Sequence, residues 1–200
     1  MKFYKSIKNI VIAFGALSVF NGCIGTTVPP MNNYAFKCND SLIEKVEQKQ
    51  YNDTLKISLP NTSSALTRRD IIFHTDNGKI GSYAYSQWVD TPADLLQNIL
   101  LRTLITSNLF TAVVRSSSNV ESGLQLESEI LQFVHKVDTK SVEVQIVLTL
   151  LDQTSRKLLK AKLFSYSIKV EKNNAENAVS AFNSAMNNLQ KDIIIWLSNS

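Results

Sequence analysis

Apolar and polar residues alternate in the second half of the chain in the way that half-buried β-strands require. In a strand, successive side chains point to opposite faces, so a period of two marks one buried face. The alternation is strict over residues 141–151, and residues 124–137 and 157–170 carry longer strand patterns. Polar residues 152–156 between the second and third segments predict a turn. The three segments together predict an antiparallel meander.

Two other segments repeat apolar residues at intervals of three and four, which is the period of an amphipathic helix. The first covers residues 92–107, with Asp90 or Thr91 as its N-cap and Pro92 at its first helical position. The second covers residues 174–197. We expect this second helix to dock on the sheet as part of the core, in preference to binding a membrane or a partner.

Shorter apolar runs predict further strands, at residues 55–59, 71–74, 80–85 and 109–114. Between the second and third of these runs, Asn77-Gly78 predicts a tight turn because Asn and Gly readily adopt positive φ. The runs on either side of that turn are therefore expected to form a β-hairpin.

The N-terminal segment has the composition of an export signal. Three lysines precede an apolar run over residues 10–20, which is shorter than the ~20 residues that cross a bilayer. The small residue Gly22 stands at the point where a signal peptidase would cut. We therefore predict that residues 1–22 form a signal peptide.

Cys23 follows this segment directly, and Val19-Phe20-Asn21-Gly22-Cys23 resembles the lipobox of bacterial lipoproteins. In that motif the cysteine thiol is diacylated and the new amino terminus is acylated. Phe20 and Asn21 depart from the leucine and the small residue that are usual there. The alternatives are an ordinary cleaved signal followed by a free cysteine, and an uncleaved membrane anchor. We predict lipidation at Cys23, which would leave Cys38 unpaired, joined to another chain or buried.

Removal of residues 1–22 leaves 178 of the 200 residues and lowers the formal charge from +4 to about +1, because three lysines are lost. So small a surplus does not indicate a nucleic-acid-binding protein. Residues 23–53, which include Pro29-Pro30, are predicted to form a tether, and residues 54–200 are predicted to form a single domain. Within the tether, residues 41–50 fit a short helix and a solvated linker equally well.

Groups that would indicate catalysis are not arranged in any recognisable motif. His74 and His135 lie in predicted strands without metal-ligand spacing, and nothing near Cys38 in sequence supplies both a histidine and a carboxylate partner. No glycine-rich phosphate loop or serine elbow occurs. We expect no enzyme activity, no cofactor and no metal. A hydrolase would require Asp90 to meet His74 or His135 in space.

An ordered set of stretches follows the lipobox and spans residues 54–197. The stretches are Tyr85-Ser86-Gln87-Trp88-Val89-Asp90, Leu95-Leu96-Gln97-Asn98-Ile99-Leu100-Leu101-Arg102-Thr103-Leu104, Ser107-Asn108-Leu109-Phe110, residues 124–133, residues 152–164 with Lys-Leu-Leu-Lys-Ala-Lys-Leu-Phe at their end, and residues 178–197. Together they resemble the ABC-type transport auxiliary lipoprotein family, which includes the paraquat-inducible lipoprotein C type. No single stretch is specific, but their order is.

The resemblance implies an α+β fold, with a mainly antiparallel sheet and two helices packed on it, like the N-terminal domain of TolB. It implies a lipid-anchored, periplasm-facing partner of an ABC permease and ATPase and a mammalian-cell-entry (MCE) substrate-binding protein, which together move phospholipid or other apolar molecules. Ile24 stands where enteric lipoproteins kept in the inner membrane carry Asp, so the outer membrane is expected. The alternative function is an outer-membrane assembly or structural lipoprotein without a transporter partner.

Two aromatic residues near the start of the first helix, Tyr85 and Trp88, are candidate partner contacts because aromatic side chains dominate interface energetics. The alternative is burial between helix and sheet, and for Trp88 we favour it. The sequence leaves the oligomeric state open, with a homo-oligomer among the options.

Overall fold

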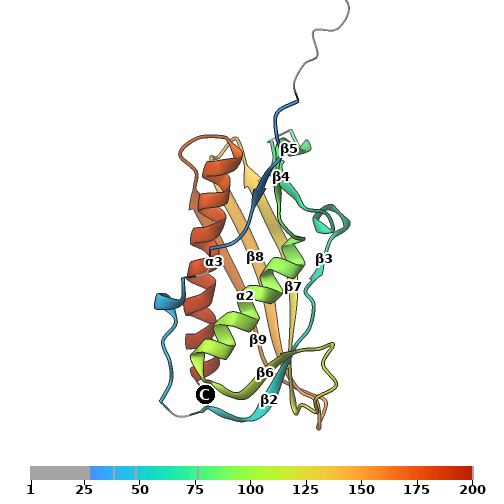
Figure 1. Ribbon diagram of the computed structural model, residues 1–200, viewed down its shortest axis with the longest axis vertical. Coiled ribbons are helices and arrows are strands. Elements are labelled where there is room, and N and C mark those ends of the chain that lie inside the picture. Colours follow the sequence, from blue (N-terminus) through green and yellow to red (C-terminus); the bar gives the residue numbers. More distant parts are fainter. Residues whose placement is uncertain (1–27, 38, 48, 76, 200) are drawn as a thin grey trace, which may run out of the picture. The chain divides into compact units, whose positions relative to one another are not determined.

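The structure is a computed structural model, and it describes residues 28–37, 39–47, 49–75 and 77–199. Within it, Met31–Ser200 form one compact unit. Helices α2 and α3 lie side by side against one face of a large sheet (Figure 1). This arrangement confirms the α+β class and the two packed helices expected from the sequence.

The three longest strands of the sheet form the predicted meander: β7 (Leu124–Lys136), β8 (Ser141–Asp152) and β9 (Lys157–Lys169). Both neighbouring pairs are antiparallel along their whole lengths. One face of β8 is at most 1% exposed, and it consists of Val142, Val144, Ile146, Leu148 and Leu150. Burial of each such side chain contributes about 1.5–3 kcal/mol relative to exposure. The strict alternation in the sequence therefore marks the centre of the core.

The other edge of β7 pairs with three short strands in succession, all parallel to it. These are β2 (Tyr51–Ile57), β3 (Asn61–Thr62) and β4 (Asp70–His74). β2 also pairs in parallel with β6 (Phe110–Arg115). The sheet is thus mixed, with antiparallel pairing in the meander and parallel pairing beside it.

β4 pairs antiparallel with β5 (Ile80–Trp88), as the predicted hairpin requires. Gly78 adopts φ 74° in the connecting turn, a conformation that glycine reaches without steric cost. The outer edge of β5 pairs in parallel with β1 (Asn32–Tyr34). The short 3₁₀ turn η3 (Ser64–Leu66) connects β3 to β4.

Helix α2 begins and ends at the predicted residues, and α3 is displaced by one residue at each end from the predicted range 174–197. Helix α2 (Pro92–Ser107) is capped by the Thr91 hydroxyl, which accepts from the Asp94 backbone N–H at 3.2 Å, and it ends at Asn108 in the left-handed conformation. Helix α3 (Ala175–Ser198) is capped by Asn174, whose side chain accepts from the Asn177 backbone N–H at 2.9 Å.

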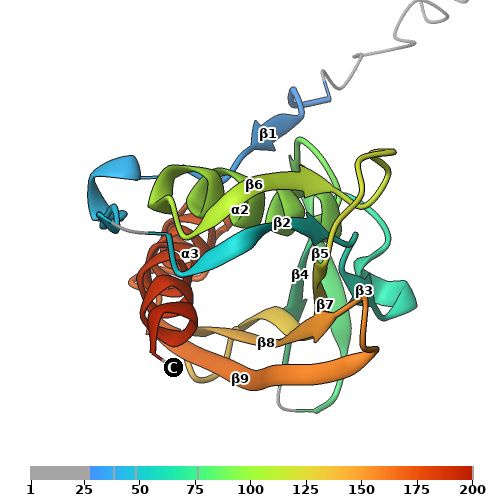
Figure 2. The ribbon, with the colours of Figure 1, turned by 90° about the horizontal axis from the view of Figure 1, so that it is seen from below.

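The sheet curves around the helices, with β2 and β6 on one side and β8 and β9 on the other (Figure 2). Helix α2 packs on β2 and β6, while α3 packs on β8 and β9. The two helices are joined by a buried hydrogen bond of 3.0 Å from the Gln190 side chain to the Thr103 hydroxyl. Apolar side chains from all these elements form one continuous core.

Residues 31–53, predicted as a tether, belong to the compact unit. We call residues 35–50 the strap. Its apolar residues Phe36, Ile43 and Val46 pack on the core, and Ile43 is only 7% exposed. Their irregular spacing gives no helix or strand period, which is why the sequence pattern did not reveal them. The folded unit therefore starts about twenty residues earlier than the predicted boundary at residue 54.

The described residues of the range 41–50, which are 41–47 and 49–50, do not form the short α-helix that the sequence allowed. In its place stands a single 3₁₀ turn, η2 (Asp40–Leu42), capped by the Asn39 side chain. The guanidinium of Arg102, on α2, forms a salt bridge with Asp40. The backbone N–H of Val46 donates to the Ser107 carbonyl at 3.0 Å, so the strap is tied to α2 at both of these positions.

Candidate functional site

The residue with the clearest predicted role, Cys23, lies outside the described residues, and so does Cys38. Lipidation at Cys23 therefore stays a prediction from the sequence. What the structure adds is the position where the chain after Cys23 joins the fold. That position is β1, on the edge of β5.

The two aromatic candidates for partner contact lie in different environments. Tyr85 is 46% exposed on β5, so its side chain is available to a partner. Trp88 is 1% exposed and lies in the core, which is the alternative that the sequence favoured for it. A side chain so deeply buried cannot contact a partner without unfolding, so Trp88 is withdrawn from the candidate contacts.

Trp88 is the centre of an aromatic cluster that joins four parts of the chain. Its ring centroid lies 4.9 Å from that of Phe36 in the strap, 5.9 Å from that of Phe133 on β7 and 5.4 Å from that of Phe182 on α3. Tilted and edge-to-face arrangements at these distances are favourable for aromatic rings. The cluster thus fastens the strap, the hairpin, the meander and α3 to one another.

The structure does not bring Asp90, His74 and His135 together. His135 pairs with Phe73, and Lys136 pairs with His74, so the two histidines point to opposite faces of the sheet. His74 pairs with Ile80 at the start of β5, whereas Asp90 follows Trp88 at its other end. The hydrolase that would need these three residues in one pocket therefore has no such site here.

His135 is the most enclosed titratable side chain among these candidates. It is 0% exposed, and its Nδ1 shares a hydrogen bond of 2.7 Å with the Tyr83 hydroxyl, while Nε2 has no partner. Burial lowers the pKa of His135, and the side chain of Asn173 opposes this in part. Burial also raises the pKa of Tyr83. His135 is therefore a neutral, structural core residue at pH 7.

We expect acid to destabilise the fold through His135. Its pKa is lower in the folded than in the unfolded state, so this contribution to stability is present above the unfolded value of about 6.5 and is lost as pH falls below it. The measurement is the unfolding temperature between pH 7.5 and 5. His135→Gln should flatten the decline, and His74→Gln, at the partly exposed histidine, should leave it as in the wild type. An identical decline in all three proteins would contradict this assignment.

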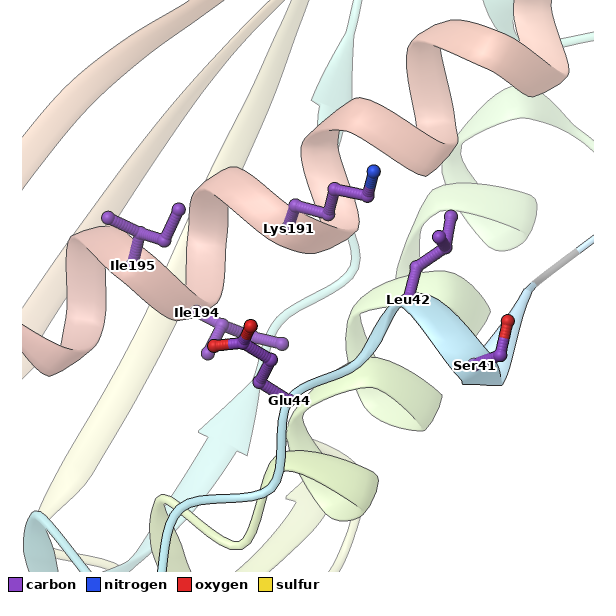
Figure 3. Close-up of a pocket in the computed structure, with 6 residues that line it drawn as sticks. All are labelled: Ser41, Leu42, Glu44, Lys191, Ile194 and Ile195. Atoms are coloured by element: carbon purple, nitrogen blue, oxygen red, sulfur yellow. The ribbon is translucent and has the colours of Figure 1, made fainter.

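A pocket of about 330 Å³ lies between the strap and α3. Figure 3 shows Leu42 pointing toward α3, with Lys191 and Ile194 of that helix close by. The Ser41 hydroxyl, also at this pocket, donates to the Asn39 side chain at 2.6 Å, so its proton is engaged by an amide oxygen and not by a base. The pocket is thus a surface recess of mixed polarity and contains no assembled nucleophile.

Among the described residues, no group of three or more His, Cys, Asp and Glu side chains is placed to hold a metal ion. In the same part of the chain, no helix has the length and apolar content to cross a membrane.

Contacts of the strap are the feature that sequence reasoning missed. Besides the Asp40–Arg102 salt bridge, the Lys37 backbone N–H donates to the side-chain oxygen of Asn183 on α3, 146 residues away, at 2.9 Å. The Asn108 side chain donates to the Val46 carbonyl at 3.2 Å. These polar partners lie on or next to helices far along the chain, so no local sequence pattern could predict the contacts.

These features define a class: an α+β domain with two helices on a curved mixed sheet and an N-terminal strap that packs on the helices. Two crystal structures share this fold. Protein XCC0632 from Xanthomonas campestris is 15% identical, with a TM-score of 0.73 over 82% of this chain and 93% of that one. An uncharacterized protein is 14% identical, with a TM-score of 0.67 over 85% and 100%. No curated protein matches the chain.

The family follows from the sequence itself. The model of the ABC-type transport auxiliary lipoprotein component family matches residues 41–194, and the chain belongs to this family. The resemblance seen in the sequence is thereby confirmed. The protein is a transport-associated lipoprotein with a membrane-anchored place in the cell envelope. The match begins inside the strap, which agrees with the strap being part of the fold.

Proposed function

We propose that the protein is a lipid-anchored auxiliary component of an ABC transport system that contains an MCE-type substrate-binding protein and moves phospholipid or other apolar molecules across the envelope. Membership of the transport auxiliary lipoprotein family is the observation that carries this proposal. The anchor is the acylated Cys23. Because Ile24 follows it in place of Asp, we place the anchor in the outer membrane with the domain facing the periplasm.

In this role the protein contributes docking and no chemistry. A domain tethered to a membrane gains a high effective concentration near membrane-bound partners, so a weak contact suffices to hold the complex. The histidines, Asp90 and Ser41 are not assembled into a reaction site, as described above, which supports a binding role. Tyr85, at 46% exposure, remains the proposed contact with the partner.

Capture of the native protein from detergent-extracted membranes tests this function. We expect an MCE protein and its permease to be recovered, and Tyr85→Ala to lower their recovery while leaving the fold intact. A matched control is Tyr34→Ala, a partly buried tyrosine on β1. Recovery of an outer-membrane barrel without a permease would instead favour the alternative, an assembly or structural lipoprotein.

A further inference from the structure

The face of the sheet opposite the helices carries a groove at the end where β4 turns into β5. We call it the hairpin groove. It has a volume of about 240 Å³ and lies between η3 and the outer faces of β4, β5 and β7. Pockets that enclose a whole small ligand usually have about 300–1,000 Å³. The hairpin groove is therefore suited to part of a long, thin apolar group.

The walls of the hairpin groove are mainly apolar, and two of them are open to solvent. Ile80 is 60% exposed and Leu131 is 48% exposed. Leu131 stands in a β-bulge, where the pairing of β7 with β8 shifts between Ile130 and Gln132. By alternation from the inward Ile130, Leu131 belongs to the outer face, and the bulge after it places Gln132 on that face as well and returns Phe133 to the inner one. Exposed apolar side chains around a recess mark a binding surface.

Basic side chains stand at the mouth of the groove. Lys136 and His74 line it as neighbours in the pairing of β4 with β7. Lys79 is exposed in the turn that precedes Ile80. An acidic residue is also near, because Glu143 pairs with Val134 in the groove wall, but its carboxylate accepts hydrogen bonds from the Ser141 and Ser167 hydroxyls at 2.9 and 2.6 Å. An apolar recess with lysine at its mouth fits an amphiphile with an anionic head group.

The length of the chain after the predicted anchor limits how far the hairpin end can lie from the membrane. Cys23 precedes Asn32, the first residue of β1, by nine residues, which span at most about 30 Å when fully extended. Asn32 pairs with Ser86, six residues beyond Ile80 and so about 20 Å from it. β1 runs parallel to β5 and is thus entered from the hairpin end. The anchor therefore reaches only about 10 Å beyond the groove.

We propose that the hairpin groove binds a phospholipid of the membrane that carries the anchor, with part of an acyl chain against Ile80 and Leu131 and the phosphate against Lys136. This inference rests on the anchor in the proposed function. It goes beyond that function in giving the domain a lipid site of its own and an orientation, with the hairpin end toward the bilayer.

Site-specific photocrosslinking of the full lipidated chain in vesicles tests the proposal. The probe is p-benzoylphenylalanine in place of Ile80, and the control is the same residue in place of Leu158. Both side chains are 60% exposed, but Leu158 lies at the opposite end of the meander, where it pairs with Leu151. The vesicles contain phosphatidylcholine with or without phosphatidylglycerol, and no other protein.

We expect lipid adducts at position 80 and only background at position 158. Lys136→Gln should lower the yield at position 80 about fivefold in vesicles with phosphatidylglycerol, the change expected for one lysine near an anionic surface. Lys157→Gln, at the far end of β9, should leave it unchanged. Equal yields at the two positions, or no effect of Lys136→Gln, would overturn the proposal.

The same preparation separates this failure from failure of the proposed function. If the chain stays bound to the vesicles but gives no adduct at position 80, the anchor is present and only the lipid site proposed for the hairpin groove is refuted. A chain whose Cys23 carries no acyl groups by mass spectrometry, and which does not remain with the vesicles, removes the anchor and with it the basis of both proposals. Partner capture, measured separately, is not affected by the first outcome.

Discussion

Trp88→Ala will lower the free energy of unfolding by about 3–5 kcal/mol, the range for removal of a fully buried aromatic side chain. Trp88 is 1% exposed and contacts rings from the strap, β7 and α3, so the cavity left behind cannot be filled by movement of one element. For a domain of this size the unfolding temperature should fall by roughly 6–20 °C. Far-UV circular dichroism during thermal and urea unfolding measures both quantities.

The control is Tyr85→Ala, three residues away on the same strand. Tyr85 is 46% exposed, and its removal should change the free energy of unfolding by no more than about 0.5–1 kcal/mol. A loss below about 1 kcal/mol for Trp88→Ala as well would show that the aromatic cluster does not hold the strap and the sheet together. The pair of variants therefore separates a core role from a surface role within one strand.

Cys23→Ala will release the protein from the membrane fraction while leaving the folded domain unchanged. Each buried methylene of an acyl chain contributes about 0.8 kcal/mol to membrane binding, so loss of the diacylated thiol removes most of the affinity. Fractionation of the envelope, followed by detection of the protein in the membrane and soluble fractions, measures the change.

Cys38→Ala is the matched control, because it removes the other cysteine and leaves the lipobox intact. It should stay with the membrane to the same extent as the wild type. Unchanged membrane association of Cys23→Ala would exclude the lipoprotein anchor and favour the uncleaved membrane anchor that the N-terminal sequence also allows.

The fold was predictable wherever one stretch of sequence carries its own signal. The strict alternation over β8 identified a strand whose inner face is buried, and Thr91 with Pro92 marked the start of α2 to the residue. In each case the determining interaction is local: a period set by the backbone, or a cap within one turn. The turn at Gly78 belongs to the same group, since its positive φ is a property of that residue.

Features that depend on distant partners were not predictable in this way. The three parallel pairings along one edge of β7 join segments separated by more than sixty residues, and a periodicity of two says nothing about which strand lies alongside. The strap is the clearest case. Phe36 follows Tyr34-Ala35 without a helix or strand period, and its place in the core is decided by the distant rings of Trp88 and Phe133.

The candidate site was predictable in part for the same reason. Composition alone could name Tyr85 and Trp88 as aromatic residues near a helix start, but their burial depends on what packs over β5, so only the structure separates 46% from 1% exposure. The hairpin groove had no signal in the sequence. Leu131 is an outward residue by alternation, but the bulge after it exchanges the faces of Gln132 and Phe133, and no period in the sequence marks that shift.

The pairing of β1 with β5 also determines how the molecule bears mechanical load. With the anchor proposed at Cys23, tension would enter the domain at the N-terminal end of β1. A component of that tension along the strand axis would load the pairs from Asn32–Ser86 to Tyr34–Trp88 together, in shear, because the backbone hydrogen bonds between parallel strands run across that axis. A short edge strand in this geometry protects the strap and the aromatic cluster behind it from being peeled away.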